Sequence, residues 1–412
     1  MPKSNIITGL DLGTTKVACV IAEIDEDEEI RIKGVGTSPS EGLRKGVVVN
    51  LERTVDSIKR AVSDAELMSG VKVSSLYAGI AGDHTRSMTS RGVIAVSSPG
   101  NEIKKSDVDR VVEQAKAVSI PIDREIIHVI PQEFIVDDQS GIKNPKGMSG
   151  VRLEAEVHIV TGAVSSAANI YKSIERAGFK VKDIVLQPLA SSYAVLDTDE
   201  KEIGVALIDI GGGTTDIAIF HEGSLKHTQV IGLGGVNVTN DIAFGLRTPR
   251  MQAEHIKTEY GCALASLIDG NEKIKVEGVG GRGEREVPRV LLCDIVEPRM
   301  EEIFSISNRE IKKTDYADLL GAGIVLTGGT AKLTGMVELA EEIFDMPAKI
   351  GIPEGISGLV DAVRDPVYST GVGLVIYGYK NMNKSEHWGK DDSLIFDKIW
   401  DRMKRWFGNM LA

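Results

Sequence analysis

The sequence contains few aromatic side chains: Phe, Trp and Tyr make up 5% of its 412 residues. Its three tryptophans, Trp388, Trp400 and Trp406, all lie close to the carboxy terminus. The long body of the chain therefore has no tryptophan, whereas a short final segment holds all three. This uneven distribution sets the final segment apart from the rest of the chain.

Cysteine and long apolar runs are also scarce. The three cysteines, Cys19, Cys262 and Cys293, are widely spaced and form no C-x-x-C pair. This pattern argues against a disulfide framework or a zinc site and indicates a reducing compartment. No run of 18 or more apolar residues is present, and the first residues do not resemble a signal peptide. We therefore expect no helix that crosses a bilayer.

Basic residues are outnumbered by acidic ones, 48 to 60, which gives a net charge of −12. Nucleic-acid binding needs clustered Lys and Arg, so we expect no nucleic-acid partner. The hydrophobic share of 42% is ordinary for a soluble globular protein, and 412 residues suggest two or three domains.

Two glycine- and threonine-rich turns repeat along the chain. Residues 5–24 are typical of two strands joined by the turn Asp11-Leu-Gly-Thr-Thr, and a second strand leads into Asp209-Ile-Gly-Gly-Gly-Thr-Thr. Aligned on their aspartates, the two segments form an internal repeat. The repeat predicts two related α/β domains, each opening with the same hairpin.

This turn chemistry suits a nucleotide. Glycines let backbone N–H groups approach phosphate oxygens, and threonine hydroxyls add donors. An aspartate at a strand end would hold Mg²⁺ through water. A third element, Gly328-Gly329 after the strand 323–327, allows close approach to a flat ring or an α-phosphate. One such hairpin is usually a plain turn, but two matched copies and a third element favour a clamped triphosphate.

Hydrophobic periodicity and turn residues predict the remaining helices and strands. Residues 84–160 predict a separate α+β unit with a helix over 107–118, capped by Ser106, and a loop over 139–150. Its later strands are expected at 125–130, 133–136 and 154–160. A strand at 286–293, a helix at 297–308 and a polar linker over 381–393 are expected further on.

The final segment has the pattern of an amphipathic helix. Its apolar positions recur at spacings of three and four: Ile395, Phe396, Ile399, Trp400, Met403, Trp406 and Phe407. Tryptophan suits the bilayer interface, and Arg402, Lys404 and Arg405 would attract anionic lipid. The alternative is a terminal helix docked on the core. The polar linker and the tryptophans favour a helix over 394–412 that binds the membrane surface.

Several motifs resemble those of the actin, Hsp70 and sugar-kinase superfamily. They are the two turns, the segments Gln187-Pro-Leu-Ala-Ser-Ser-Tyr-Ala and Tyr368-Ser-Thr-Gly-Val-Gly-Leu374, Gly328-Gly329-Thr330, and Ala253-Glu254-x-x-Lys257. Within this superfamily the chain resembles the FtsA family of bacterial cell-division proteins. That resemblance rests on Ala78-Gly-Ile-Ala-Gly-Asp-His84, on His128-Val-Ile-Pro-Gln-Glu-Phe134, on residues 141–153, and on the basic tail.

The resemblance implies an α/β, actin-like fold of duplicated ribonuclease H-like domains, with an inserted α+β subdomain and a carboxy-terminal amphipathic helix. The implied boundaries are 1–83, 163–198 for subdomain 1A, 84–162 for the inserted subdomain 1C, 199–232 and 301–380 for 2A, 233–300 for 2B, 381–393 for the linker and 394–412 for the membrane-targeting helix.

The resemblance also implies the site residues. Asp11 and Asp209 would orient Mg²⁺ through water, and Gln187 would position the attacking water. Because Pro188 fixes the backbone after Gln187, we expect at most slow ATP hydrolysis. The implied ATP contacts are Gly13, Thr14, Thr15, Lys16, Gly211, Gly212, Gly213, Thr214, Thr215, Gly234, Gly235, Glu254, Lys257, Gly328, Gly329 and Lys332.

The implied function is assembly at the division site, on the cytoplasmic face of the cell membrane. Such a protein polymerises into actin-like filaments, binds the carboxy-terminal peptide of FtsZ on residues 233–300, tethers the FtsZ ring to anionic lipid and recruits later division membrane proteins. Two alternatives are a small-molecule kinase of the same superfamily and another actin-like scaffold, of cell shape or pilus assembly.

Overall fold

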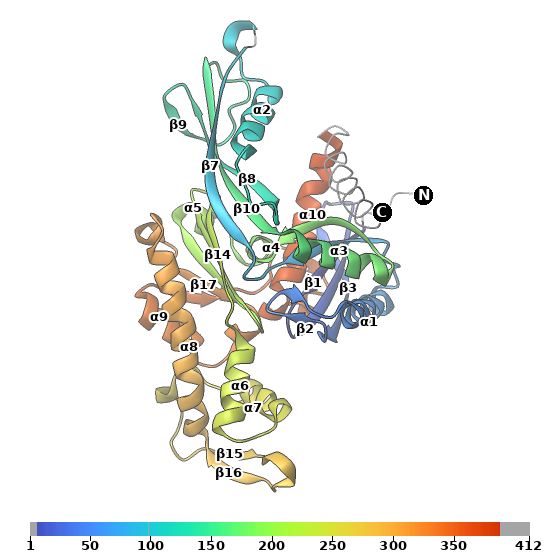
Figure 1. Cartoon of the computed structure of the whole chain (residues 1–412), viewed down its shortest axis with the longest axis vertical. Helices are drawn as coiled ribbons and strands as arrows, with labels where there is room; N and C mark the ends of the chain where they lie inside the picture. The colour runs from blue at the N-terminus through green and yellow to red at the C-terminus, as the bar shows by residue number, and fades with distance from the viewer. Residues whose placement is uncertain (1–5, 98, 388–412) are drawn as a thin grey trace.

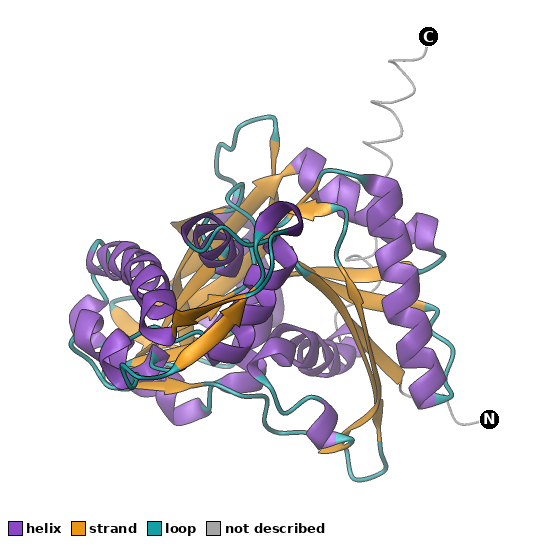
Figure 2. Cartoon of the chain, turned by 90° about the horizontal axis from the view of Figure 1, so that it is seen from below, coloured by secondary structure: helices purple, strands orange, loops and turns teal. Residues whose placement is uncertain are grey.

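The computed structural model describes residues 6–97 and 99–387. The chain is elongated, with two sheets side by side in its middle, a smaller sheet at one end and a helical region at the other (Figure 1). Seen from below, the strands gather in the centre and helices surround them (Figure 2). Among the described residues, no helix is long and apolar enough to cross a membrane.

The first half is built on a six-stranded sheet in the order β11-β6-β1-β2-β3-β19. Its strands are β1 (Ile6–Leu12), β2 (Lys16–Ile24), β3 (Ile30–Pro39), β6 (Ser75–Ile80), β11 (Lys180–Leu186) and β19 (Ser357–Gly358). The short strands β4 (Leu43–Arg44) and β5 (Val47–Val48) pair beside it. Helices α1 (Leu51–Ser69) and α3 (Val164–Ala177) cover one face and share a hydrophobic core with β1, β2 and β6. Most residues of β1 and β2 are buried because helices cover both faces of this sheet.

The second half repeats this design. Its five-stranded sheet has the order β14-β13-β12-β17-β18, formed by β12 (Val205–Ile210), β13 (Thr215–His221), β14 (Ser224–Ile231), β17 (Ile324–Thr327) and β18 (Ala348–Ile350). In each sheet the first three strands in sequence pair antiparallel: β1, β2 and β3 in one, β12, β13 and β14 in the other. Two further strands lie on the other side of the first strand and run parallel to it: β6 and β11, or β17 and β18. The predicted repeat of two related α/β domains is confirmed.

Two helices fill the space between the sheets. They are α4 (Gln187–Val195) and α10 (Ser369–His387), and their apolar residues join one hydrophobic core with strands of both halves. The two helices pack closely through glycine, because a Cβ on Gly373 would overlap the carbonyl oxygen of Ala190. Both helices begin at the same place, next to the aspartate turns.

Two insertions extend from this frame. The first contains β7 (Arg86–Ala95), α2 (Lys105–Lys116), β8 (Arg124–Val136), β9 (Gln139–Ile142) and β10 (Arg152–Ala163), with the sheet order β7-β10-β8-β9. The second, at the opposite end of the molecule, contains α6 (Gly235–Gly245), α7 (Arg250–Tyr260), β15 (Lys273–Val276) and β16 (Arg285–Pro288) (Figure 1). The other helices of the second half are α5 (Thr198–Ile203), α8 (Arg289–Lys312) and α9 (Met336–Phe344).

Several predicted elements of the first insertion were wrong in detail. Helix α2 is capped at Lys104, not Ser106, because the carboxylate of Asp107 accepts the Lys104 N–H at 3.0 Å. The two strands expected on either side of Pro131 are one strand, β8, with a bulge where Gln132 has no partner on β10. The expected loop 139–150 contains the short strand β9.

Two predictions in the second half were also wrong. The expected strand 286–293 ends at Pro288, and α8 begins there and continues through Pro298, well before the predicted start at 297. The expected linker over 381–393 is helical as far as residue 387, because α10 continues to His387. The rest of the linker, Trp388 and the tail 394–412 lie outside the described residues.

We predict that Gly373→Ala destabilises the chain by about 1–3 kcal/mol, because the added methyl group forces α10 away from α4. Urea unfolding followed by circular dichroism measures the effect. The matched control is Gly270→Ala, whose Cβ would meet no atom within 4 Å, and we expect it to change stability by less than about 0.5 kcal/mol. Equal effects of the two substitutions would contradict the close packing of α10 on α4.

Candidate functional site

The two aspartate turns meet at one cavity of about 190 Å³ between the halves. The turns touch through glycine, since a Cβ on Gly212 would lie 2.5 Å from Thr15 Cγ2 and one on Gly213 would lie 2.5 Å from Thr14 Oγ1. The predicted residues that line the cavity are Asp11, Gly13, Thr14, Thr15, Lys16, Gln187, Asp209, Gly211, Gly212, Gly213, Thr214, Gly328 and Gly329. Segments far apart in the sequence therefore converge as the repeat predicted.

Two of the carboxylates that line the cavity, Asp11 and Asp209, lie near the ends of β1 and β12, the first strand of each sheet. Burial raises the pKa of Asp11 to about 7, although nearby Lys16 partly offsets it, and Asp209 raises it further. Burial also raises the pKa of Asp209, although Ser191 donates a hydrogen bond to its Oδ2 at 2.7 Å. Both carboxylates are thus short of compensating positive charge.

A third carboxylate, that of Asp216, also lines the cavity. Its pKa is raised well above the usual value by burial and then by the charge of Asp209. Thr214 donates to Oδ2 at 3.1 Å, whereas Oδ1 is buried and has no hydrogen-bond partner. Asp216 directly follows the second turn and was not predicted as a site residue.

These carboxylates fit a hydrated cation better than a protein-only metal site. Among the described residues, no group of three or more His, Cys, Asp and Glu side chains is arranged to hold a metal ion. Magnesium usually keeps several waters and binds through one or two carboxylates together with phosphate oxygens. The unsatisfied Asp216 oxygen and the raised pKa values of the aspartates fit such an ion, which would neutralise their charge.

Gln187 lies where β11 ends and α4 begins, with Pro188 in the first turn of the helix. Its Nε2 donates to Asp11 Oδ1 at 3.1 Å. Proline suits this first turn because its missing N–H would have no partner inside the helix. The amide thus lines the cavity and is directed at the Asp11 carboxylate.

Lys16 lines the cavity but its ammonium group is directed toward the start of α10. Its Nζ donates to the Val367 carbonyl at 3.2 Å and lies 4.0 Å from the ring centre of Tyr368. Burial lowers the pKa of this lysine to about 8, while Asp11 opposes the shift.

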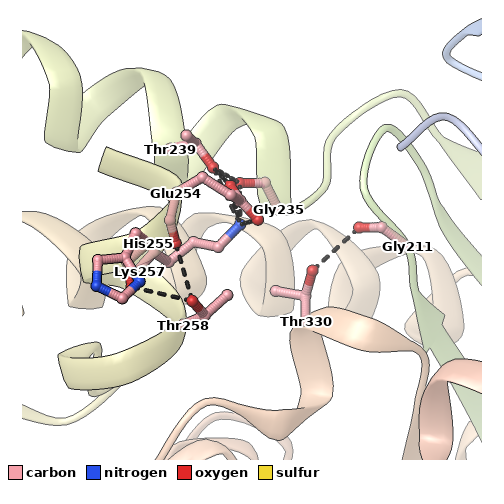
Figure 3. Close-up of polar contacts among 8 residues, drawn as sticks. All are labelled: Gly211, Gly235, Thr239, Glu254, His255, Lys257, Thr258 and Thr330. Atoms are coloured by element: carbon pink, nitrogen blue, oxygen red, sulfur yellow. Dashed lines mark hydrogen bonds and ion pairs between the residues drawn. The ribbon is translucent and has the colours of Figure 1, made fainter. Parts of the chain in front are cut away.

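The predicted residues around α6 and α7 lie beside the cavity and do not line it. The Gly235 N–H donates to the Gly211 carbonyl at 3.0 Å. The Thr330 hydroxyl donates to the same carbonyl at 3.1 Å (Figure 3). Lys257 is buried and donates to both Glu254 oxygens, at 2.8 and 2.7 Å, and to Thr239 and Gly235 (Figure 3). Gly234 precedes α6, and Lys332 forms an ion pair with Asp365.

Thr215 departs from the expectation that it contacts phosphate. It begins β13, where successive side chains point to opposite faces, so it faces away from Thr214. Its side chain is fully buried and its hydroxyl donates to the Leu233 carbonyl at 3.0 Å. Thr214 is left as the threonine of this turn that lines the cavity.

Sequence reasoning also missed Leu12 within the first turn and, outside the turns, the lining residues Gly46, Pro366, Val367 and Thr370. The Gly46 N–H donates to Thr14 Oγ1 at 3.2 Å, and Ser191 Oγ lies 3.0 Å from Thr370 Oγ1. Ser191 and Thr370 lie in two of the motifs that resemble the superfamily, so their hydroxyls could have been proposed as site groups from the sequence. Gly46 lies in an ordinary turn and carried none.

Comparisons with known proteins agree with this architecture. The family described as "Cell division protein FtsA" matches residues 206–373, and "SHS2 domain inserted in FTSA" matches residues 82–161. Among solved structures, the chain is similar to a PilM-PilN type IV pilus biogenesis complex (TM-score 0.66, 15% identity, 92% of this chain and 99% of that one). It is also similar to MreB5 of Spiroplasma citri bound to ADP (TM-score 0.57, 15% identity, 93% and 100%). These likenesses confirm the actin-like fold.

Curated relatives match nearly the whole chain. The cell division protein FtsA of Pseudomonas aeruginosa is 49% identical over 406 residues, 97% of each chain. FtsA of Escherichia coli K12 is 43% identical over 380 residues, 90% of each chain. FtsA of Bacillus subtilis is 41% identical over 381 residues, 92% of this chain and 85% of the relative. This chain therefore belongs to the FtsA family of cell division proteins.

Proposed function

We propose that this protein binds ATP with Mg²⁺ between its two halves, assembles into actin-like filaments and tethers FtsZ to the cytoplasmic face of the cell membrane at the division site. The observation that supports the nucleotide site best is the convergence of two glycine-threonine turns and three buried carboxylates on one cavity. Membership of the FtsA family supports the role in division.

In this proposal the turns hold the phosphates and the carboxylates hold the ion. The lining glycines and the hydroxyl of Thr14 supply donors for phosphate oxygens, while Asp11 and Asp209 orient Mg²⁺ through water. Gly328 and Gly329 border the nucleotide, with Lys332, Glu254 and Lys257 further along the same side. Bound Mg²⁺ would supply positive charge against the phosphates and the carboxylates.

Slow hydrolysis fits the geometry of Gln187. Its amide already donates to Asp11 at 3.1 Å, and Pro188 restricts the backbone that follows. Positioning a water for attack would require the amide to leave or share this hydrogen bond. We therefore propose that the conformational state of the protein depends on whether a nucleotide is bound, and less on how fast that nucleotide is hydrolysed.

The proposed FtsZ surface lies at the far end of the second half. Phe244 at the end of α6 and Met251 at the start of α7 are 88% and 87% exposed, which is unusual for large apolar side chains. Exposed aromatic and methionine side chains are typical anchors for a partner peptide. Filament formation rests on the actin-like fold, and one neighbour with that fold is a MamK double helical filament (TM-score 0.53, 12% identity).

The nucleotide site is tested with Asp11→Asn, which keeps the shape of the side chain and removes its charge. We expect Mg²⁺-dependent ATP affinity to fall about 10–100-fold, the range for altered metal-site partners. The readout is the ATP-induced rise in the thermal unfolding midpoint, with Mg²⁺ or with EDTA. Asp138→Asn is the control because that side chain is 99% exposed. Unchanged Mg²⁺ dependence in Asp11→Asn would refute the assigned role of this carboxylate.

The FtsZ surface is tested with Phe244→Ser and Met251→Ser. We expect each to weaken binding of the FtsZ carboxy-terminal peptide by about 1–2 kcal/mol, or about 5–30-fold, because each removes an apolar anchor. Leu67→Ser is the control, since Leu67 is 81% exposed on α1 in the other half. Fluorescence anisotropy of a labelled peptide measures the affinities. Equal loss in the Leu67 variant would place the binding surface elsewhere.

The membrane helix is tested on vesicles. Deleting residues 394–412 should abolish flotation with phosphatidylglycerol vesicles, because the deletion removes the apolar stripe. Replacing Arg402, Lys404 and Arg405 with Gln should weaken binding to anionic vesicles by about 3 kcal/mol, at about 1 kcal/mol per charge, and leave binding to neutral vesicles unchanged. Full binding after the deletion would rule out the tail as the anchor.

A further inference from the structure

The motif His128-Val-Ile-Pro-Gln-Glu-Phe134 lies on β8 of the first insertion, yet two of its polar side chains bond to other parts of the molecule. His128 Nε2 lies 3.0 Å from the backbone nitrogen of Leu186 on β11. A backbone N–H can only donate, so this ring nitrogen must be the unprotonated acceptor. Burial lowers the pKa of His128 to about 4, which keeps the ring neutral.

Leu186 is the residue immediately before Gln187. The hydrogen bond that the Leu186 N–H donates to His128 therefore fixes the last peptide of β11 where the chain turns into α4. Gln187 in turn donates to Asp11 Oδ1 at 3.1 Å. Two hydrogen bonds and one peptide thus connect the first insertion to a carboxylate of the nucleotide cavity.

Gln132 makes the matching connection to the second half. It is the extra residue of the β8 bulge, and its side chain is 2% exposed. Bulges commonly redirect a side chain, and this one directs Nε2 to the carbonyls of Leu225 and Lys226 on β14, at 2.9 and 3.3 Å.

Neighbouring side chains of the insertion reinforce this contact. Ser87 Oγ donates to the Thr228 carbonyl at 2.9 Å, and His158 Nε2 lies 3.2 Å from Thr228 Oγ1. Lys143 Nζ donates to Ser224 Oγ at 3.0 Å. The insertion contacts β11 of one half and β14 of the other; Figure 1 shows β14 beside β7 and β10.

This bridge has a mechanical consequence. The nucleotide cavity lies between the two halves, so any change in their separation must move β14 relative to β11. Strand β8 is hydrogen-bonded to both and cannot follow both when they move apart. Ligand-driven closure of this kind shifts packed elements between discrete arrangements.

We propose that the first insertion is coupled to the nucleotide cavity through β8, with His128 and Gln132 as the positioning residues that carry the coupling. The proposal rests on the proposed function, because it requires ATP to bind between the halves. A nucleotide in the cavity fixes the distance between the two halves at which His128 bonds to β11 and Gln132 bonds to β14. The insertion is then held more tightly against both halves. By thermodynamic reciprocity, a partner that displaces the insertion weakens nucleotide binding by the same factor.

The test compares the full-length wild type with His128→Leu and His128→Gln. Leucine removes the acceptor, whereas the glutamine carbonyl can reach a similar position and accept the Leu186 N–H. Hydrogen–deuterium exchange over residues 124–136 is measured with and without MgATP, and the Kd of a fluorescent ATP analogue is measured alongside. We expect MgATP to slow exchange there in the wild type and in His128→Gln. In His128→Leu this ATP-dependent slowing should disappear and Kd should rise about five-fold or more.

A second variant keeps the proposal testable if His128→Leu does not fold. Gln132→Met keeps the length of the side chain and removes its donors, so the ATP-dependent slowing over residues 224–231 should disappear. The proposal is overturned if both variants respond to MgATP as the wild type does. If the wild type binds ATP but exchange over 124–136 is unchanged, only the coupling fails. If the wild type binds no ATP, the proposed function fails and the coupling with it.

Discussion

The burial of three aspartates around one cavity, without matching positive charge, is the constraint on which the rest of the structure depends. Asp11, Asp209 and Asp216 are each at most 9% exposed, and burial raises the pKa of all three. Lys16 lies close by, yet its ammonium group bonds to the Val367 carbonyl. Isolated buried carboxylates are costly in water-free surroundings. Their persistence is understandable if the folded chain is arranged for a cation and its phosphate partner.

The packing around this cavity explains how the fold tolerates that cost. Helices α4 and α10 lie between the two sheets and begin at the cavity, and each supplies a hydroxyl near Asp209: Ser191 and Thr370. Close helix packing at Gly373 leaves little freedom between them. The hydrophobic core that joins the halves therefore also holds the donors that partly satisfy the carboxylate.

The sequence predicted the features that depend on local pattern. The two hairpins and their repeat follow from alternation and turn residues. It could not predict features decided by contacts distant in sequence. His128 was expected within a strand and Gln132 between two strands, and neither was predicted to bond outside the insertion, since their partners lie 58 and 93 positions away. The start of α8 was missed because its early residues read equally as a strand, and tertiary packing of Leu292 and Val296 decided the outcome.

The duplicated frame is symmetric, but its charges are not. The residue after the paired threonines is Lys16 in the first turn and Asp216 in the second. Lys16 reaches the segment before α10, whereas Asp216 keeps one oxygen without a partner beside Asp209. A symmetric pair of turns alone would hold a phosphate chain in either direction. Because one turn supplies a cation and the other an extra carboxylate, the two directions would differ in electrostatic energy for the proposed nucleotide, and its metal-bound end would be favoured on one side of the cavity.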